Sequence, residues 1–224
     1  MRFRSPPRVV GKLSRWPAAN VKSEPMLYRA DPRFALANGG PITKEFVTRL
    51  LELNEVQDLK PGEIVIDSRV HMLMRGWFPC IPGWHQDDVP RSLGPAGWQP
   101  NYDAYNPKKP TQLLMAVIDA HDAPTHSLTE FCTGVVDVPW PLDVSVTVYG
   151  AWDSYLNSLP KLATKRIESG DLIRFDSNSM HRGTPAHEHG FRYFIRAFWH
   201  THEKPANEVR RNANVYMQWS TAGW

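Results

Sequence analysis

The alternation of apolar and polar residues predicts a short helix followed by many short strands. In residues 42–54 the apolar side chains recur at helical spacing on one face, and they are Phe46, Leu50, Leu51 and Leu53. Stretches rich in β-branched and aromatic residues predict strands at 63–74, 113–119, 131–138, 144–149, 172–175 and 191–199. Frequent Pro and Gly residues predict long loops at 76–110, and a second short helix is expected at 152–159.

Short strands separated by turn residues favour a mainly β fold. Proline supplies 20 of the 224 residues, about twice the usual share, which limits long helices. We therefore predict a double-stranded β-helix, a jelly-roll or cupin-like fold, with a few flanking helices. The chain is expected to divide into a basic N-terminal arm at 1–22 and a single domain at 23–224.

Composition narrows the class of protein. Nine Trp residues argue against a disordered chain, and no apolar run approaches the roughly 20 residues that a membrane helix needs. The two cysteines, Cys80 and Cys132, cannot form a disulfide framework, and no apolar segment of the secretory-signal type follows the basic N-terminus. We therefore expect a cytoplasmic protein without a membrane segment.

The net charge of +3 is unevenly distributed along the chain. Six of the 26 basic residues lie in residues 1–22, which contain no acidic residue, so the remaining 20 face 23 acidic ones and the rest of the chain carries −3. A basic arm of this kind can bind the phosphates of a nucleic acid. A solvated terminus explains the same charges, and the arm also holds residues able to pack on the body: Val9, Val10, Leu13 and Trp16.

Candidate metal ligands lie in two separate segments. His85 and Asp87 form a His-x-Asp pair, and in an extended chain residues i and i+2 point to the same side. A second histidine, His181, follows the strand pattern that begins at Gly170. Two histidines and one carboxylate are the ligand set of the facial triad, which binds non-haem Fe(II) and leaves positions open for substrate chemistry.

Arginines on the last predicted strand indicate an anionic ligand. Arg192 follows His181 by 11 positions, and Arg192 and Arg196 share one face of this strand. A guanidinium can bind a carboxylate through two parallel hydrogen bonds, and a buried charge needs an anionic partner. An anionic cosubstrate would supply it. Arg196 has two interpretations, a second carboxylate ligand or a structural ion pair.

His85, Asp87, His181 and Arg192, in this order on a strand-rich background, resemble the Fe(II)/2-oxoglutarate-dependent dioxygenases. The turn at 168–176 is also similar to theirs, and the resemblance covers about residues 60–200. It implies that His85, Asp87 and His181 bind Fe(II), that 2-oxoglutarate chelates the metal, and that Arg192 holds its distal carboxylate. Dioxygen (O2) would take the remaining position, and the reaction would hydroxylate a substrate with release of succinate and CO2.

Two positions depart from that family pattern. Many relatives carry Ser or Thr two residues after the arginine, where this chain has Phe194. Another hydroxyl would then be needed for the carboxylate, and the candidates are Thr147, Tyr149 and Thr184. Asp88 adjoins Asp87, but parity with His85 favours Asp87 as the ligand, with Asp88 turned away toward Arg91.

Other clusters have more than one interpretation. Histidines near turns could form a zinc site, although such residues without Cys are more often solvated: His121, His126, His187, His189, His200 and His202. Aromatic residues around His85 could pack the loops or form the wall of a substrate pocket: Trp77, Phe78, Trp84, Trp98, Tyr102 and Tyr105.

We therefore predict an Fe(II)- and 2-oxoglutarate-dependent hydroxylase that acts on a small molecule or a nucleobase. The basic arm is the reason to consider nucleic acid, from which a base would have to be flipped out to reach the metal. A non-catalytic cupin-like binding module is the alternative from another class. The sequence does not indicate an oligomeric state.

Overall fold

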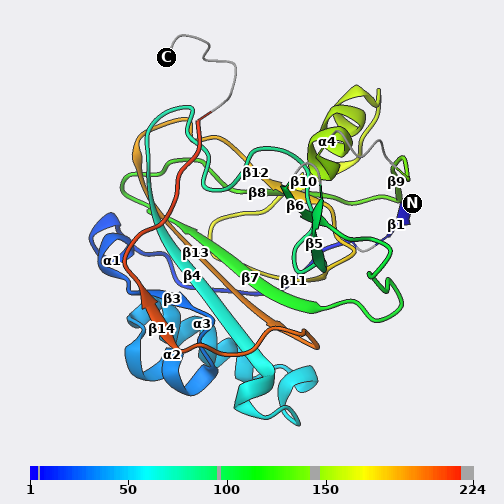
Figure 1. Cartoon of the computed structure of the whole chain (residues 1–224). Helices are drawn as coiled ribbons and strands as arrows, with labels where there is room; N and C mark the ends of the chain where they lie inside the picture. The colour runs from blue at the N-terminus through cyan, green and yellow to red at the C-terminus, as the bar shows by residue number, and fades with distance from the viewer. Residues whose placement is uncertain (5, 95–96, 142–146, 218–224) are drawn as a thin grey trace.

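The structure, a computed structural model, describes residues 1–4, 6–94, 97–141 and 147–217 (Figure 1). Within these residues every strand pairing is antiparallel. The main sheet has the order β2 (Arg8–Lys12), β11 (Asp171–Asp176), β7 (Gln112–Asp119), β13 (Gly190–Trp199) and β4 (Ile64–Leu73). A second sheet has the order β10 (Thr164–Arg166), β8 (Thr129–Cys132) and β12 (His181–Gly183).

Smaller elements surround the two sheets. Three strand pairs are β1 (Arg2–Phe3) with β9 (Val136–Asp137), β3 (Met26–Tyr28) with β14 (Glu208–Arg210), and β5 (Arg91–Gly94) with β6 (Gly97–Pro100). The helices are α1 (Ala18–Ser23), α2 (Pro32–Asn38), α3 (Pro41–Leu51) and α4 (Val148–Ser158), with 3-10 turns η1 (Asn54–Val56) and η2 (Pro61–Glu63). None of the helices in the described residues has the length and apolar character of a membrane span.

The predicted fold class, mainly β with few flanking helices, is confirmed. Buried side chains from both sheets fill the space between them, including Val117 and Phe175 from the main sheet and Phe131 from the second. This arrangement of antiparallel sheets is compatible with the predicted double-stranded β-helix.

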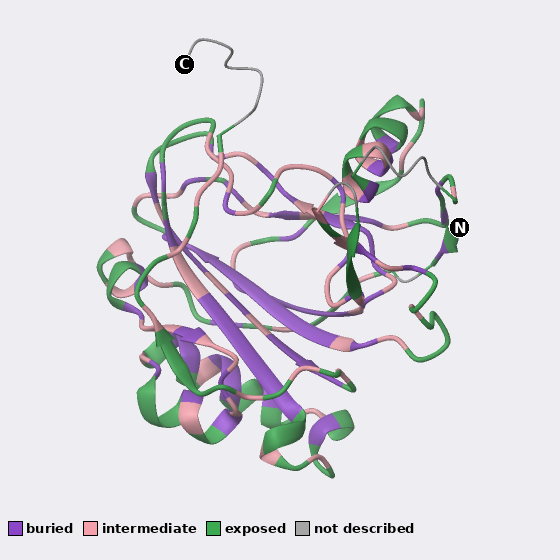
Figure 2. Cartoon of the chain, viewed as in Figure 1, coloured by how far each residue is buried: buried purple, intermediate pink, exposed green. Residues whose placement is uncertain are grey.

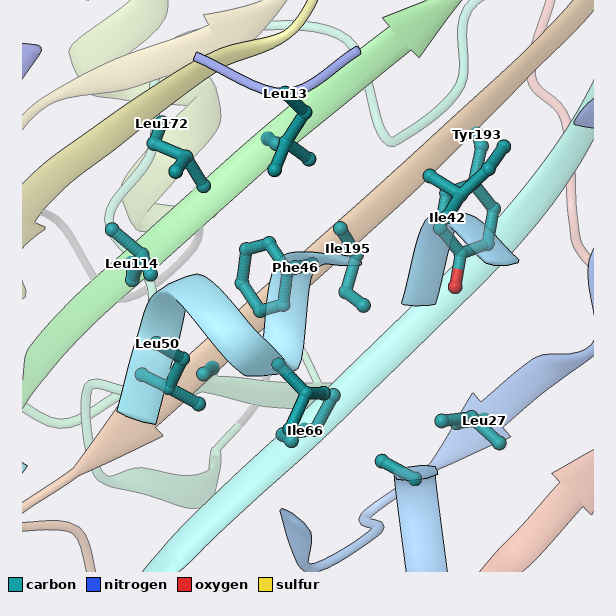
Figure 3. Close-up of a cluster of buried hydrophobic side chains, with 14 of the residues drawn as sticks. Leu13, Leu27, Ile42, Phe46, Leu50, Ile66, Leu114, Leu172, Tyr193 and Ile195 are labelled. Atoms are coloured by element: carbon teal, nitrogen blue, oxygen red, sulfur yellow. The ribbon is translucent and has the colours of Figure 1, made fainter. Parts of the chain in front are cut away.

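Helices α1–α3 cover the opposite face of the main sheet (Figure 1). Figure 3 shows Phe46 and Leu50 of α3 lying over Ile195 of β13 and Ile66 of β4. Full burial of a side chain of this size stabilises the fold by about 1.5–3 kcal/mol. The outer faces of these helices stay exposed while the central strands are buried (Figure 2), and Leu51, at 43% exposure, lies outside the buried stripe.

Three sequence-based expectations about the elements need correction. The predicted strand at 131–138 is two short strands, β8 and β9, and the segment 76–110 contains the β5–β6 hairpin as well as loops. The strand predicted at 144–149 is wrong at Val148 and Tyr149, which begin helix α4; residues 142–146 lie outside the described residues. The reason is tertiary packing: Val148, Trp152 and Leu156 recur every four residues and form one buried stripe, which overrides the β preference of Val.

The basic segment 1–22 lies along the sheets. Its strand β2 pairs with β11 and forms one edge of the main sheet, and β1 pairs with β9. Leu13 is buried in the cluster under helices α1–α3, whereas Val9 and Val10 are exposed. The segment is therefore continuous with the sheet, and the expected boundary at residue 22 falls inside helix α1.

Candidate metal centre

The three predicted metal ligands, His85, Asp87 and His181, converge at one point of the structure. One ligand atom from each lies within 4.8 Å of the other two. His181 Nε2 is 3.5 Å from Asp87 Oδ2, and the two imidazole rings are 4.6 Å apart between centroids. Two imidazoles and one carboxylate are the donor set of non-haem Fe(II), so these residues fit such an ion.

A short backbone pairing brings the two segments together. The His85 N–H donates to the His181 carbonyl over 2.9 Å, and the His181 N–H donates to the His85 carbonyl over 3.0 Å. The His85 segment therefore extends the second sheet beside β12. Gly83 permits this approach, because its φ of +108° favours glycine and a Cβ there would lie 3.0 Å from the Asp153 side chain.

Backbone carbonyls orient both imidazole rings. His85 Nδ1 lies 2.9 Å from the Gly83 carbonyl oxygen, and His181 Nδ1 lies 3.1 Å from the Ser179 carbonyl oxygen. A carbonyl can only accept, so each Nδ1 carries the hydrogen and each Nε2 keeps a lone pair for a metal. Such partners are typical of metal-binding histidines.

Asp87 is held as a carboxylate by an arginine. Arg196 Nη1 lies 2.6 Å from Asp87 Oδ2, and Arg196 Nη2 lies 3.4 Å from Asp67 Oδ2. Burial acts to raise the pKa of Asp87, but Arg196 and then His181 oppose it, and the pKa lies well below its ordinary value. The same two aspartates raise the pKa of Arg196 against the effect of burial. Asp87 is therefore ionised, as a metal ligand must be.

His85 is neutral at physiological pH. Burial is the main cause that lowers its pKa to about 4, and His181 adds to the shift, while Asp87 opposes it. A neutral imidazole is the form that binds metals.

A cavity of about 570 Å³ opens beside these three residues. Its size lies within the range of small-molecule sites. One wall is formed by alternate residues of β4 and β13, in the cross-strand pairs Asp67–Arg196, Arg69–Phe194 and His71–Arg192. Their neighbours Tyr193, Ile195 and Ala197 point into the helix-covered core instead.

Arg192 is 2% exposed and lines this cavity without a carboxylate partner among the described residues. Its Nη1 donates to Ser127 Oγ over 3.4 Å, and its Nε has no hydrogen-bond partner in the described segments. Burial lowers the pKa of Arg192 to about 10, so the group is still charged at pH 7. A buried and unpaired guanidinium is unfavourable by itself, which indicates an anionic ligand.

The hydroxyl that accepts a hydrogen bond from Arg192 belongs to Ser127, which the sequence did not single out. Of the three predicted candidates, Thr184 exchanges hydrogen bonds with the Leu128 backbone and Thr147 is exposed at the start of α4. Tyr149 lines the cavity, but its hydroxyl donates to the Gln86 carbonyl over 2.8 Å.

Asp88 does not turn toward Arg91 as expected. It lines the cavity, and its carboxylate accepts a hydrogen bond from Thr111 over 2.5 Å. The φ of Asp88 is +53°, which breaks the simple alternation of an extended chain.

The remaining histidines form no compact zinc cluster among the described residues. His126 and His187 have ring centroids 6.3 Å apart. His202 joins Asp88 and Glu203 in a second group of potential ligands, but its ring is largely exposed and Glu203 is paired with Arg29.

The six aromatic residues around His85 do not line the cavity. Trp84 and Tyr102 are buried against Trp152 of α4, so this part of the segment packs as a second core. The aromatic rings that do line the cavity come from other segments and are Tyr149, Phe194 and Tyr216.

No protein-family model and no curated protein matches the sequence. The crystal structure of HygX from Streptomyces hygroscopicus with iron bound is 14% identical over 88% of this chain and 81% of that one, with a TM-score of 0.42. The non-heme monooxygenase ThoJ, in a nickel complex, is 11% identical over 88% and 82%, with a TM-score of 0.35. Because these values are low, the chemistry inferred for this chain rests on the geometry of its own residues.

Proposed function

We propose that this chain is an Fe(II)- and 2-oxoglutarate-dependent oxygenase that hydroxylates a small molecule. One observation carries the proposal: a single cavity holds both the His85, Asp87 and His181 group and the buried, unpaired Arg192. The ligand set alone suits many metal proteins. An anion receptor in the same cavity is what supports a cosubstrate with a distal carboxylate.

The residues divide into a metal group and a cosubstrate group. Bound Fe(II) and 2-oxoglutarate would supply the oxidising chemistry by activating dioxygen. His85 and His181 would present Nε2 to the ion, with Asp87 as the third ligand. Arg192 would bind the distal carboxylate beside Ser127. Arg196 is better suited to orienting Asp87 than to binding the cosubstrate, because two carboxylates already surround it.

The size of the cavity and the state of the basic segment favour a small molecule over a nucleobase. Lys12 is 2.7 Å from Glu168 and Arg2 is 3.8 Å from Asp137, so two of the six basic side chains are paired within the fold. We expect no nucleic-acid affinity that falls steeply with salt. A steep salt dependence that weakens in the Arg4→Gln, Arg8→Gln double variant would instead support a nucleic-acid substrate.

The proposal is tested by adding 2-oxoglutarate to the Fe(II) protein without oxygen. We expect a metal-to-ligand charge-transfer band and, once oxygen is admitted, slow release of succinate even without substrate. His181→Ala should abolish metal binding, whereas His121→Ala, a change at an exposed histidine outside the cavity, should leave it intact. Metal-loaded protein that neither binds 2-oxoglutarate nor consumes it contradicts the proposal and favours a non-catalytic binding module.

A further inference from the structure

The charged groups that line the cavity are unevenly paired, because its four carboxylates, Asp67, Asp87, Asp88 and Glu203, do not each face one of its arginines. Four arginines line it, and Arg196 is the one whose charge is matched by carboxylates within the described residues. Arg91 is exposed, so water can solvate it. The buried Arg192 and the half-buried Arg69 remain, and neither forms an ion pair with a described carboxylate. The proposed cosubstrate accounts for one of them.

Arg69 occupies a different place in the wall from Arg192. Its Cα partner across the strands is Phe194, which lies two residues from Arg192 and two residues from Arg196 along β13. Each of these steps along the strand is about 7 Å. Arg69 belongs to β4, the edge strand of the main sheet, and Arg192 belongs to the interior strand β13. The outer edge of β4 is bridged to Ala30 at Ile66, so a second ligand would reach Arg69 through the cavity that both arginines line.

The surroundings of Arg69 favour an anion. Burial, then Arg196 and Arg210, lowers the pKa of Arg69, and the nearby aspartates do not offset this. Those aspartates are already engaged, because Asp67 contacts both Arg196 and Arg210, and Asp87 contacts Arg196. Arg69 therefore lies in a net positive field that a bound anion would relieve.

A second unpaired polar group lies beside Arg69 on the same strand face. His71 is 2% exposed, lines the cavity, and has no hydrogen-bond partner at either ring nitrogen within the part of the chain that the structure describes. Burial, then Arg192 and Arg69, lowers the pKa of His71 to about 2, so the ring is neutral and can donate one hydrogen bond. Buried polar groups without partners are rare in folded proteins, and a ligand in the cavity would satisfy this one.

We propose that Arg69 binds an anionic group, a carboxylate or a phosphate, of the primary substrate, so that the enzyme acts on a small acidic molecule. The inference rests on the proposed function, because it takes Arg192 to bind the cosubstrate and leaves Arg69 for the substrate. Arg69 supplies the charge and the fork of donors, and His71, two residues along β4 and opposite Arg192, offers a hydrogen bond at the boundary between the two anion sites.

The test uses benzoate and methyl phosphate as probes, added to the full chain loaded with Zn(II) and 2-oxoglutarate. Zn(II) replaces Fe(II) so that ligand-observed NMR signals are not broadened by the metal. We expect at least one probe to bind, and Arg69→Gln to weaken it about 10- to 100-fold, as expected for the loss of hydrogen bonds to a charged group. Binding of benzoate alone identifies a carboxylate receptor, and binding of methyl phosphate alone identifies a phosphate receptor.

Two controls separate this site from the cosubstrate site. Arg69→Lys should recover part of the probe affinity, and Arg75→Gln, at an exposed arginine outside the cavity, should change nothing. The charge-transfer band of the Fe(II) protein should show unchanged 2-oxoglutarate affinity in Arg69→Gln. Three outcomes overturn the inference. They are a loss of 2-oxoglutarate affinity in Arg69→Gln, equal probe binding by Arg69→Gln and the unaltered chain, and no probe binding at all.

The two proposals fail in different ways. If the unaltered chain binds no 2-oxoglutarate, the proposed function fails. Probe binding to the metal-loaded protein that depends on Arg69 would still support the anion site in that case, and probe binding that does not depend on Arg69 would overturn it.

Discussion

The two faces of strand β13 have opposite physical properties, although they alternate residue by residue. Tyr193, Ile195 and Ala197 are buried against helices α1–α3. Arg192 and Arg196 point the other way, into the cavity. The first set stabilises the fold through apolar burial, whereas the second includes a buried charge that the fold leaves unpaired. One strand thus joins a stabilising face to a face kept for ligands.

Strand β4 repeats the same division and shows what it means for function. Ile66 lies in the helix-covered core, and the polar residues Asp67, Arg69 and His71 line the cavity. Groups at a ligand site are commonly retained at a cost in stability. Substitutions on the helix-covered face should therefore lower stability, whereas substitutions on the cavity face should lower ligand affinity.

The largest effect is expected on the core face. Phe46→Ala should lower the free energy of unfolding by about 3–5 kcal/mol, because a fully buried ring is lost and a cavity remains. Leu51→Ala on the same helix is the control and should change stability by less than about 0.5 kcal/mol, since Leu51 is exposed. Denaturant unfolding measures both, and equal losses would contradict the assigned packing of α3.

On the cavity face, Arg192→Met should separate binding from stability. We expect 2-oxoglutarate affinity to fall by about 2–5 kcal/mol, because the carboxylate loses its charged partner. The metal-free protein should unfold with an unchanged or higher free energy, since a buried unpaired charge is removed. Calorimetric titration and urea unfolding give the two values, with the exposed Arg75→Met as the control. A stability loss as large as that of Phe46→Ala would break the comparison of the faces.

Arg196→Met should act on the metal through Asp87. The ion pair at 2.6 Å holds the Asp87 carboxylate in place, and loss of such a supporting contact typically lowers metal affinity about 10- to 100-fold. Arg210→Met is a matched control, because Arg210 pairs with Asp67 at 3.1 Å and makes no ion pair with Asp87. Competition against a metal indicator measures both variants, and equal losses would place the effect in the Asp67 cluster.

The effect that is smallest near neutral pH, and that grows as the pH falls, is expected in the stability at His71. Burial, then Arg192 and Arg69, lowers its folded pKa to about 2 from 6.5. The unfolded chain therefore binds a proton below pH 6.5 that the folded chain does not, and stability is lost as the pH falls. His71→Leu should make the slope shallower by about 1.4 kcal/mol per pH unit between pH 6 and 4. Urea unfolding across this range, with the exposed His121→Leu as the control, checks it, and an unchanged slope would show that His71 is charged in the fold.

The periodicity of apolar residues predicted those helices and strands whose burial pattern is regular along the chain. Helix α3 and strands β4, β7, β11 and β13 lie close to the predicted segments. Helix α4 was missed at its start because the Trp152 stripe that stabilises it packs on distant residues such as Trp84. Pairings over long sequence distances, such as β2 with β11, leave no local signal.

Sequence motifs predicted the candidate metal ligands, but they did not predict the other residues that line the cavity. His85, Asp87 and His181 converge as their spacing and order suggested. Asp67, Arg69 and His71 could have been noticed, because they alternate with apolar or small residues in a segment already predicted to be a strand. The contact between Ser127 and Arg192 joins residues 65 positions apart, and no local sequence pattern predicts it.

The position of β2 bears on how the protein can be handled. Without this strand, β11 would present unpaired backbone donors and acceptors along an apolar edge, a template for cross-β association. With it, the outermost strand carries Arg8 and Lys12, which discourage another chain from pairing there. A variant that lacks residues 1–22 should therefore precipitate or form oligomers, whatever the ligand bound within.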